Sequence, residues 1–180
     1  MTTTPAGFSP RSSNRLTTHD LGRFEGETLF ARIARQVCMA GCLPRKELYE
    51  AWETAIRIRR RLRGRRVIDV AGGHGLLAHV LLLLDDSSPQ ALVVDPQVPP
   101  SSIALHEALV AGWPRLDGRV TYTGRVIDEV PVDASDLLVS VHACGALTDV
   151  VLERARFVGA PIAVLPCCHD ASRCDTGGLT

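Results

Sequence analysis

A run of apolar residues that ends in three glycines constrains the fold of this chain more than any other feature. Residues 66–75 read RVIDVAGGHG, and the apolar segment Leu76–Leu84 follows directly. The β-branched run favours a buried strand and the later segment favours a helix, so the glycines form the turn between them. Glycine lets the backbone approach a ligand closely, while the free N–H groups of a new helix point at it. This stretch therefore predicts a nucleotide-type binding site at the turn.

Length and composition indicate one domain with a sizeable core. The chain has 180 residues, of which 46% are hydrophobic. We expect no membrane span, because no apolar run reaches the roughly 20 residues that a bilayer requires. The first residues, MTTTPAG, lack the basic and apolar regions of a secretion signal, so we expect a cytoplasmic protein. In that compartment the six cysteines favour thiols or ligands over a disulfide framework.

The first third of the chain divides into two parts. Residues 1–20 are rich in Ser, Thr, Pro and Arg without apolar periodicity, which predicts a disordered tail. Residues 21–64 show helical spacing of apolar residues over 24–40 and again over 44–62. We expect this N-terminal helical cap to cover one edge of the sheet or the mouth of the site.

Residues 65–180 alternate between short apolar strands and helices. The pattern predicts strands at 66–70, 91–95, 120–123, 137–141 and 162–165, with helices at 76–84, 103–111 and 146–157. Such alternation with uniformly apolar strands indicates an α/β fold: a Rossmann-like, doubly wound, mainly parallel sheet of about five strands. Ligands of these sheets bind beyond the carboxyl ends of the strands, at the point where the strand order reverses.

Two kinds of nucleotide ligand fit the glycine turn. Residues 73–78, GHGLLA, match the relaxed dinucleotide pattern G-x-G-x-x-G/A, and Asp95 follows at the distance of a ribose-binding acid. A dinucleotide-binding oxidoreductase is therefore one candidate. Asp69, an acid at the end of the first strand, has no role in that site and favours a different ligand.

Residues 69–75, DVAGGHG, resemble the first motif of the class I S-adenosylmethionine-dependent methyltransferases, D/E-x-G-x-G-x-G, with Ala71 in place of the first glycine. The resemblance implies that S-adenosylmethionine is the methyl donor, and that Asp69 binds its ammonium group directly or through water. It also implies that Asp95 accepts hydrogen bonds from both ribose hydroxyls and that Asp128 reads the adenine amine. The backbone beside the donor would come from Ala71, Gly72, Gly73, Gly75 and Val141.

The segments after the fourth and fifth strands resemble a narrower branch of these enzymes. Residues 142–149 read HACGALTD and residues 166–169 read PCCH, similar to the methyltransferase domain of tRNA 2'-O-methyltransferases that act in the acceptor stem. Asp170 departs from that branch, where a second histidine is usual, and no N-terminal zinc-finger module is present. The candidates for a catalytic base are His142, His169 and Asp149, because deprotonating a hydroxyl or an amine requires such groups.

Cysteines and a histidine near these strand ends raise the question of a metal. Cys and His are zinc ligands by type, but their spacing here matches no standard zinc module, so we predict no metal site. If a metal were bound, its ligands would come from Cys144, Cys167, Cys168, His169 and Cys174.

Charge is distributed unevenly along the chain. Residues 1–66 carry 14 Lys/Arg and 6 Asp/Glu, and residues 67–180 carry 6 and 14, so the two parts have formal charges of +8 and −8. The basic block Arg57–Arg66 is either a solvated helix face or a surface that follows the phosphate backbone of tRNA.

The predicted sheet lacks the C-terminal hairpin that is usual in these methyltransferases, because only 15 residues follow Leu165. We expect either a core that is incomplete at its C-terminus or a five-stranded core whose exposed edge is covered by the N-terminal helices or by a second subunit in a homodimer. Three functions stay open: a methyltransferase acting on RNA or a small molecule, a dinucleotide-binding oxidoreductase, and a methyltransferase-fold binding module without turnover.

Overall fold

A five-stranded parallel sheet forms the centre of the protein in a computed structural model that describes residues 8–165. The strand order is β3-β2-β1-β4-β5, and every neighbouring pair is parallel. The predicted Rossmann-like α/β fold is confirmed. The strands are β1 (Val67–Val70), β2 (Ala91–Val94), β3 (Val120–Thr123), β4 (Leu137–Ser140) and β5 (Ile162–Val164).

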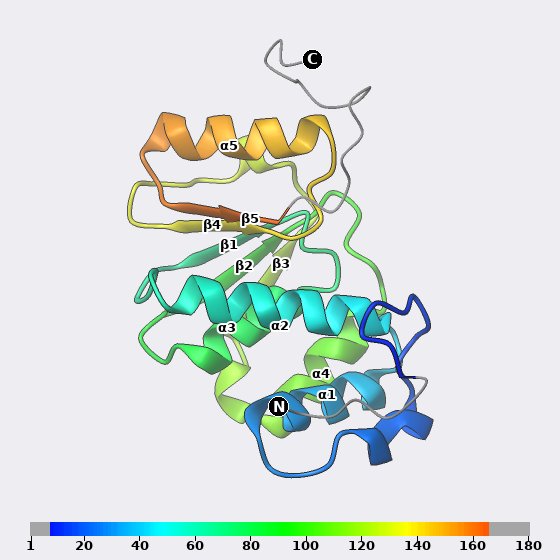
Figure 1. Ribbon diagram of the computed structural model, residues 1–180. Coiled ribbons are helices and arrows are strands. Elements are labelled where there is room, and N and C mark those ends of the chain that lie inside the picture. Colours follow the sequence, from blue (N-terminus) through cyan, green and yellow to red (C-terminus); the bar gives the residue numbers. More distant parts are fainter. Residues whose placement is uncertain (1–7, 166–180) are drawn as a thin grey trace.

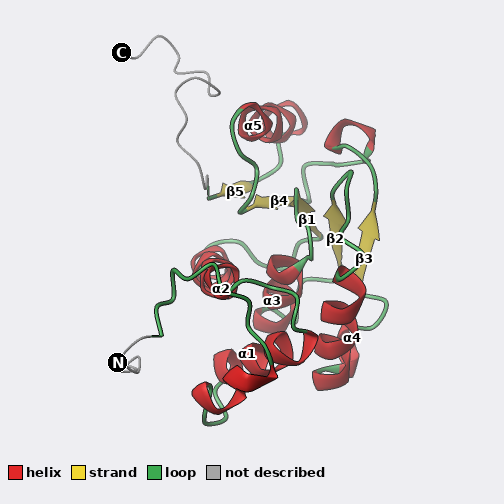
Figure 2. Cartoon of the chain, turned by 90° about the vertical axis from the view of Figure 1, so that its right-hand side faces the viewer, coloured by secondary structure: helices red, strands yellow, loops and turns green. Residues whose placement is uncertain are grey.

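Helices cover the two faces of the sheet unequally (Figures 1 and 2). One face carries α5 and the short 3₁₀ helix η3, whereas the other carries α2, α3 and α4, with α1 packed beneath them. The helices are α1 (Leu29–Ala40), α2 (Arg45–Arg59), α3 (Leu76–Leu84), α4 (Ser102–Gly112) and α5 (Ala146–Val158), and the 3₁₀ helices are η1 (Thr18–Arg23), η2 (Pro114–Leu116) and η3 (Ile127–Glu129).

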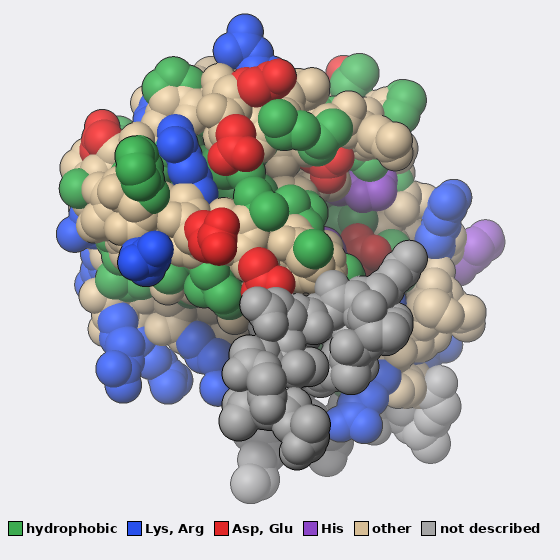
Figure 3. Space-filling view, turned by 90° about the horizontal axis from the view of Figure 1, so that it is seen from above, with side chains coloured by type: hydrophobic (Ala, Val, Ile, Leu, Met, Phe, Trp, Pro, Cys, Tyr) green, Lys and Arg blue, Asp and Glu red, His purple; other side chains and the backbone are tan. Residues whose placement is uncertain are grey.

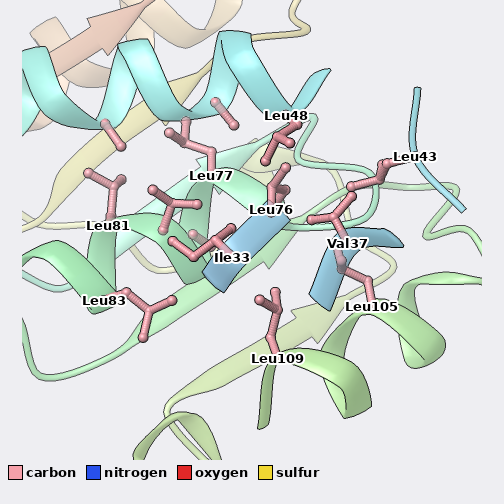
Figure 4. Packing of buried hydrophobic residues seen from close by; sticks show 14 of the residues in the cluster. Ile33, Val37, Leu43, Leu48, Leu76, Leu77, Leu81, Leu83, Leu105 and Leu109 are labelled. Atoms are coloured by element: carbon pink, nitrogen blue, oxygen red, sulfur yellow. The ribbon is translucent and has the colours of Figure 1, made fainter. Parts of the chain in front are cut away.

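The N-terminal helices belong to the main core of the domain. Helix α2 packs on α3, and α1 packs on α4, so both extend the helical layer on one face of the sheet and do not cover an edge. Ile33 of α1, Leu48 of α2 and Leu109 of α4 are completely buried in one apolar cluster (Figure 4). Burial of such side chains stabilises each by roughly 1.5–3 kcal/mol, which makes the cap inseparable from the sheet.

Two expectations for the N-terminal part are wrong. Residues 8–20 are not a disordered tail: Phe8 and Leu16 are buried, because each finds an apolar surface on the helical layer. Residues 1–7 lie outside the described part of the chain. Helix α1 begins at Leu29 and not near Phe24, because Thr28 caps it by accepting a hydrogen bond from the Ala31 N–H.

The direction of α2 decides what lies at the site. Its first turn lies at the carboxyl ends of the strands, and its last turn lies at the opposite edge of the sheet (Figure 1). Residues near Pro44 therefore approach the glycine turn, whereas the arginines after Thr54 lie at the other end of the molecule.

Within residues 8–165, no helix combines the length and apolar character needed to cross a membrane.

Candidate functional site

A cavity of about 260 Å³ lies at the carboxyl ends of β1, β2 and β4, where the strand order reverses. This is the position that parallel α/β sheets use for ligands. Its walls combine the glycine turn, the strand ends and the beginning of α2. The lining residues are Leu43, Glu47, Ala51, Ala71, Gly72, Gly73, His74, Leu76, Leu77, Asp95, Val141 and His142.

The glycine turn lies directly against the sheet at Gly72. A Cβ atom at this position would lie 2.7 Å from Val93 Cγ1 and 2.9 Å from Asp69 Cγ, closer than real Cβ atoms come. The next position, Gly73, has φ +51° and faces open space, while Gly75 begins α3 with φ +76°. Close packing thus requires glycine at Gly72 and also at Gly75, where a Cβ atom would lie 2.8 Å from Val93 Cγ2, while the left-handed backbone favours glycine at Gly73.

Ala71 stands where the resembling motif has its first glycine. Its φ of +54° is the only left-handed value of a non-glycine residue in the described part of the chain. The Ala71 N–H donates to the Val94 carbonyl at 2.8 Å, which holds the turn at the end of β2. The small methyl side chain allows this conformation at a cost of about 1 kcal/mol.

Asp95, directly after β2, joins the turn to the neighbouring strand. Its Oδ2 accepts the Gly73 N–H at 3.0 Å, and its Oδ1 accepts the Gln97 N–H at 2.9 Å. Each carboxylate oxygen retains a second lone pair that can accept a ligand hydroxyl. The predicted ribose-binding acid therefore lines the cavity with its orientation fixed by two backbone groups.

Asp69 lies behind the turn and does not line the cavity. Its side chain is 1% exposed, its Oδ2 accepts the Ala78 N–H at 3.2 Å, and its Oδ1 has no hydrogen-bond partner in the described structure. Burial, with a smaller contribution from the charge of Asp95, raises the pKa of Asp69 to about 7. The carboxyl group supports the turn and the start of α3 from below, and Gly72 separates it from the cavity.

The buried His79 and the half-buried His106 support the same turn. His79 Nδ1 lies 2.7 Å from the Gly75 carbonyl oxygen, which can only accept, so this nitrogen carries the proton. Its Nε2 then accepts a hydrogen bond from His106 Nδ1 at 3.1 Å. Burial lowers the pKa of His79 to about 4, so the ring is neutral and its role is structural.

Three cavity residues come from the helical cap, and the sequence analysis did not identify them. Leu43 precedes α2, while Glu47 and Ala51 lie on its first two turns. Glu47 is half-buried, and desolvation raises its pKa, partly offset by the nearby His142. The sequence indicated only that the cap would cover an edge of the sheet or the mouth of the site. The structure places the start of α2 at the mouth of the site.

The other predicted site residues divide into three groups. Val141 and His142 line the cavity at the end of β4. Gly75 caps α3 without lining it, and Asp149 lies on the first turn of α5, outside the lining. Asp128 lies on η3, is not among the residues that line the cavity, and borders a groove along α5.

The remaining candidates are the metal ligands and one catalytic base. Residues 167, 168, 169 and 174 lie outside the described part of the chain, so the candidates Cys167, Cys168, His169 and Cys174 have no structural outcome. Cys144 lies between β4 and α5. Between residues 8 and 165, no group of three or more His, Cys, Asp or Glu side chains is arranged to hold a metal ion.

Comparison with solved structures places this architecture among methyltransferases. An O-methyltransferase family protein from Burkholderia thailandensis has 21% identity and a TM-score of 0.53 over 91% of this chain and 49% of its own. A candidate O-methyltransferase from Nostoc punctiforme has 15% identity and a TM-score of 0.50 over 74% of this chain and 40% of its own. The chain shares the Rossmann-like α/β fold of these two structures. It spans about half the length, or less, of these two structures.

Sequence comparison adds no closer relative. No family model matches the chain. No curated protein matches it either.

Replacing Gly72 with alanine tests whether the close approach forms the site. We expect Gly72→Ala to displace the turn and to destabilise the protein by roughly 1–3 kcal/mol, as overpacking does. Gly124→Ala is the matched control, since nothing lies within 4 Å of its added methyl group. Urea denaturation measures both, and equal effects of the two substitutions would contradict the packing described for Gly72.

Replacing Asp69 with asparagine tests its burial. The folded protein binds a proton at Asp69 with a pKa of about 7, against an ordinary value of 3.8, so the folded state binds more protons between these values. The contribution of Asp69 therefore becomes less favourable as pH rises from about 4 to about 7. An asparagine at this position does not titrate, so the variant lacks this loss of stability. We therefore expect the free energy of unfolding of Asp69→Asn to rise relative to that of the wild type by roughly 1–3 kcal/mol as pH increases over this range. A pH-independent difference would contradict this interpretation.

Proposed function

We propose that this protein binds S-adenosylmethionine in the cavity and transfers its methyl group to a small-molecule acceptor. The observation that carries the proposal is the junction of the glycine turn with Asp95, in which the Gly73 N–H binds Oδ2 at 3.0 Å. It combines a backbone surface without side chains and an oriented carboxylate in one cavity wall. Adenosine presents a flat body and a diol to such a wall, and a carboxylate with two acceptor oxygens matches the diol.

The charges of the lining suit this donor. Among the described residues that line the cavity, Asp95 and Glu47 are acidic and none is Lys or Arg. S-adenosylmethionine carries a sulfonium and an ammonium group, and both are favoured next to carboxylates. When bound, it supplies an electrophilic methyl group, and the protein needs to hold the acceptor in line with it.

His142 is the group best placed to remove a proton from the acceptor. It is half-buried directly after β4, which pairs with β1, and it lines the cavity. A neutral imidazole accepts a proton at near-neutral pH, which suits an acceptor hydroxyl or protonated amine. Asp149 does not border the cavity, so His142 is the base that we propose from the described residues.

The arrangement of the basic block favours a small molecule over tRNA as the acceptor. Twelve residues of α2 separate Glu47 from Arg59, or roughly 18 Å along a helix. Two further arginines are engaged within the protein: Arg65 donates to loop carbonyls, and Arg66 forms an ion pair with the buried Asp136 at 2.6 Å. Basic side chains gather over the far end of α2, on the left of the view from above (Figure 3).

Calorimetry with S-adenosylmethionine, S-adenosylhomocysteine and NAD tests the donor. We expect both adenosyl compounds to bind and NAD not to bind. Asp95→Ala should weaken adenosyl binding by about tenfold or more, because it removes charge-assisted hydrogen bonds. Asp117→Ala, at an exposed acid before β3, serves as the control and should have no effect. Binding of NAD alone would favour the oxidoreductase.

The acceptor is tested by methyl transfer from labelled donor to a pool of small metabolites and, separately, to total tRNA. We expect label in the small-molecule pool, and we expect His142→Gln to lower its transfer rate by about 10²-fold or more while donor binding is retained. Serine at the exposed positions Arg57, Arg60 and Arg61 should leave that rate unchanged. If tRNA is labelled instead, and the three serine substitutions abolish that labelling, RNA is the acceptor. If the protein binds the donor but transfers no label, it is a binding module.

A further inference from the structure

Glu47 is a cavity residue that lies outside the glycine motif and outside the sheet. It occupies the first turn of α2 and borders the cavity together with Leu43 and Ala51. The glycine turn and His142 line the same cavity, and His142 lies close enough to interact with the Glu47 charge. Of the three cavity residues that the helical cap contributes, Glu47 is charged and the other two are apolar.

The carboxylate of Glu47 has no hydrogen-bonded or ion-paired partner in the described part of the chain, and the charges of His142 and Lys46 offset its desolvation only in part. Within residues 8–165, its side chain forms no hydrogen bond and no ion pair within 4 Å, although it is half-buried. Asp95, the other lining acid, accepts two backbone N–H groups. Burial of a carboxylate without such partners is unfavourable, and a cationic ligand group relieves that cost. Glu47 is therefore the lining acid whose partner the described protein does not supply.

Asp69 is not available for direct contact with a ligand cation. It is 1% exposed, and Gly72 stands between its carboxyl group and the cavity. A Cβ atom added at Gly72 would lie less than 3 Å from the Asp69 carboxyl group. The Oδ1 of Asp69 is buried without a partner among the described residues, and Asp69 is not one of the residues that line the cavity. A cation in the cavity would therefore meet Glu47 before it could meet Asp69.

We propose that Glu47 binds the ammonium group of the methionine part of the donor, the role that the sequence resemblance gives to Asp69. This inference depends on the proposed function and adds a residue of the helical cap to the donor site. Asp95 then holds the ribose at one end of the cavity, and Glu47 holds the amino acid at the other. The donor would bridge the sheet and the cap.

Two ligands that differ only in the amino-acid part test this inference. S-adenosylhomocysteine carries the ammonium and carboxylate groups, whereas 5'-methylthioadenosine keeps the adenosine and the sulfur without them. We expect Glu47→Gln to weaken S-adenosylhomocysteine binding by about 10- to 100-fold, the range for a charged hydrogen bond, and to leave 5'-methylthioadenosine binding unchanged. Isothermal titration calorimetry of both ligands measures this selectivity.

Glu50→Gln is the matched control, because Glu50 lies on the same helix but borders a different groove. It should alter neither affinity. Asp69→Asn should not discriminate between the two ligands. The inference is overturned if Glu47→Gln leaves S-adenosylhomocysteine binding intact, weakens both ligands equally, or shows less selectivity than Asp69→Asn. A wild-type protein that binds neither ligand would overturn the proposed function itself, which distinguishes the two failures.

Discussion

The close approach of the chain at Gly72 is the constraint on which the rest of the site depends. The turn passes between Val93 of β2 and the Asp69 side chain with no room for a β-carbon. In that position the Gly73 N–H reaches Asp95, and the Gly75 carbonyl accepts a hydrogen bond from His79 of α3. One contact between backbone and sheet thus determines the direction of α3, the orientation of Asp95 and the shape of the cavity floor.

The cavity is a joint product of the sheet and the helical cap. The sheet contributes the turn, Asp95 and His142, and α2 contributes Glu47 and the apolar residues beside it. Because α2 packs on α3, which itself starts at the glycine turn, the two walls are held at a fixed spacing by apolar contacts. The lining holds two acids and, among the described residues, no Lys or Arg, so it favours cationic groups on a ligand.

Much of the fold was predictable because its signals are local. Apolar strands, the glycine turn and helical periodicity gave all five strands and the position of Asp95, since each depends on neighbouring residues. Glu47 was not predictable in its role, because its position in the cavity depends on how α2 packs against α3. Asp69 was identified as an important acid, yet its burial behind Gly72 is a property of packing that spacing alone does not reveal. The order of residues 8–20 was missed because Phe8 and Leu16 are isolated apolar residues without periodicity.

The packing of α1 on α4 has a consequence for the time at which the chain can fold. The side of α1 that packs on α4 is covered only when the residues around Leu105 and Leu109 have been synthesised, some seventy positions after Ile33 and Val37. A ribosome adds about 5–20 residues per second, so this side of α1 stays uncovered for several seconds. During that interval the nascent chain is a natural client for chaperones.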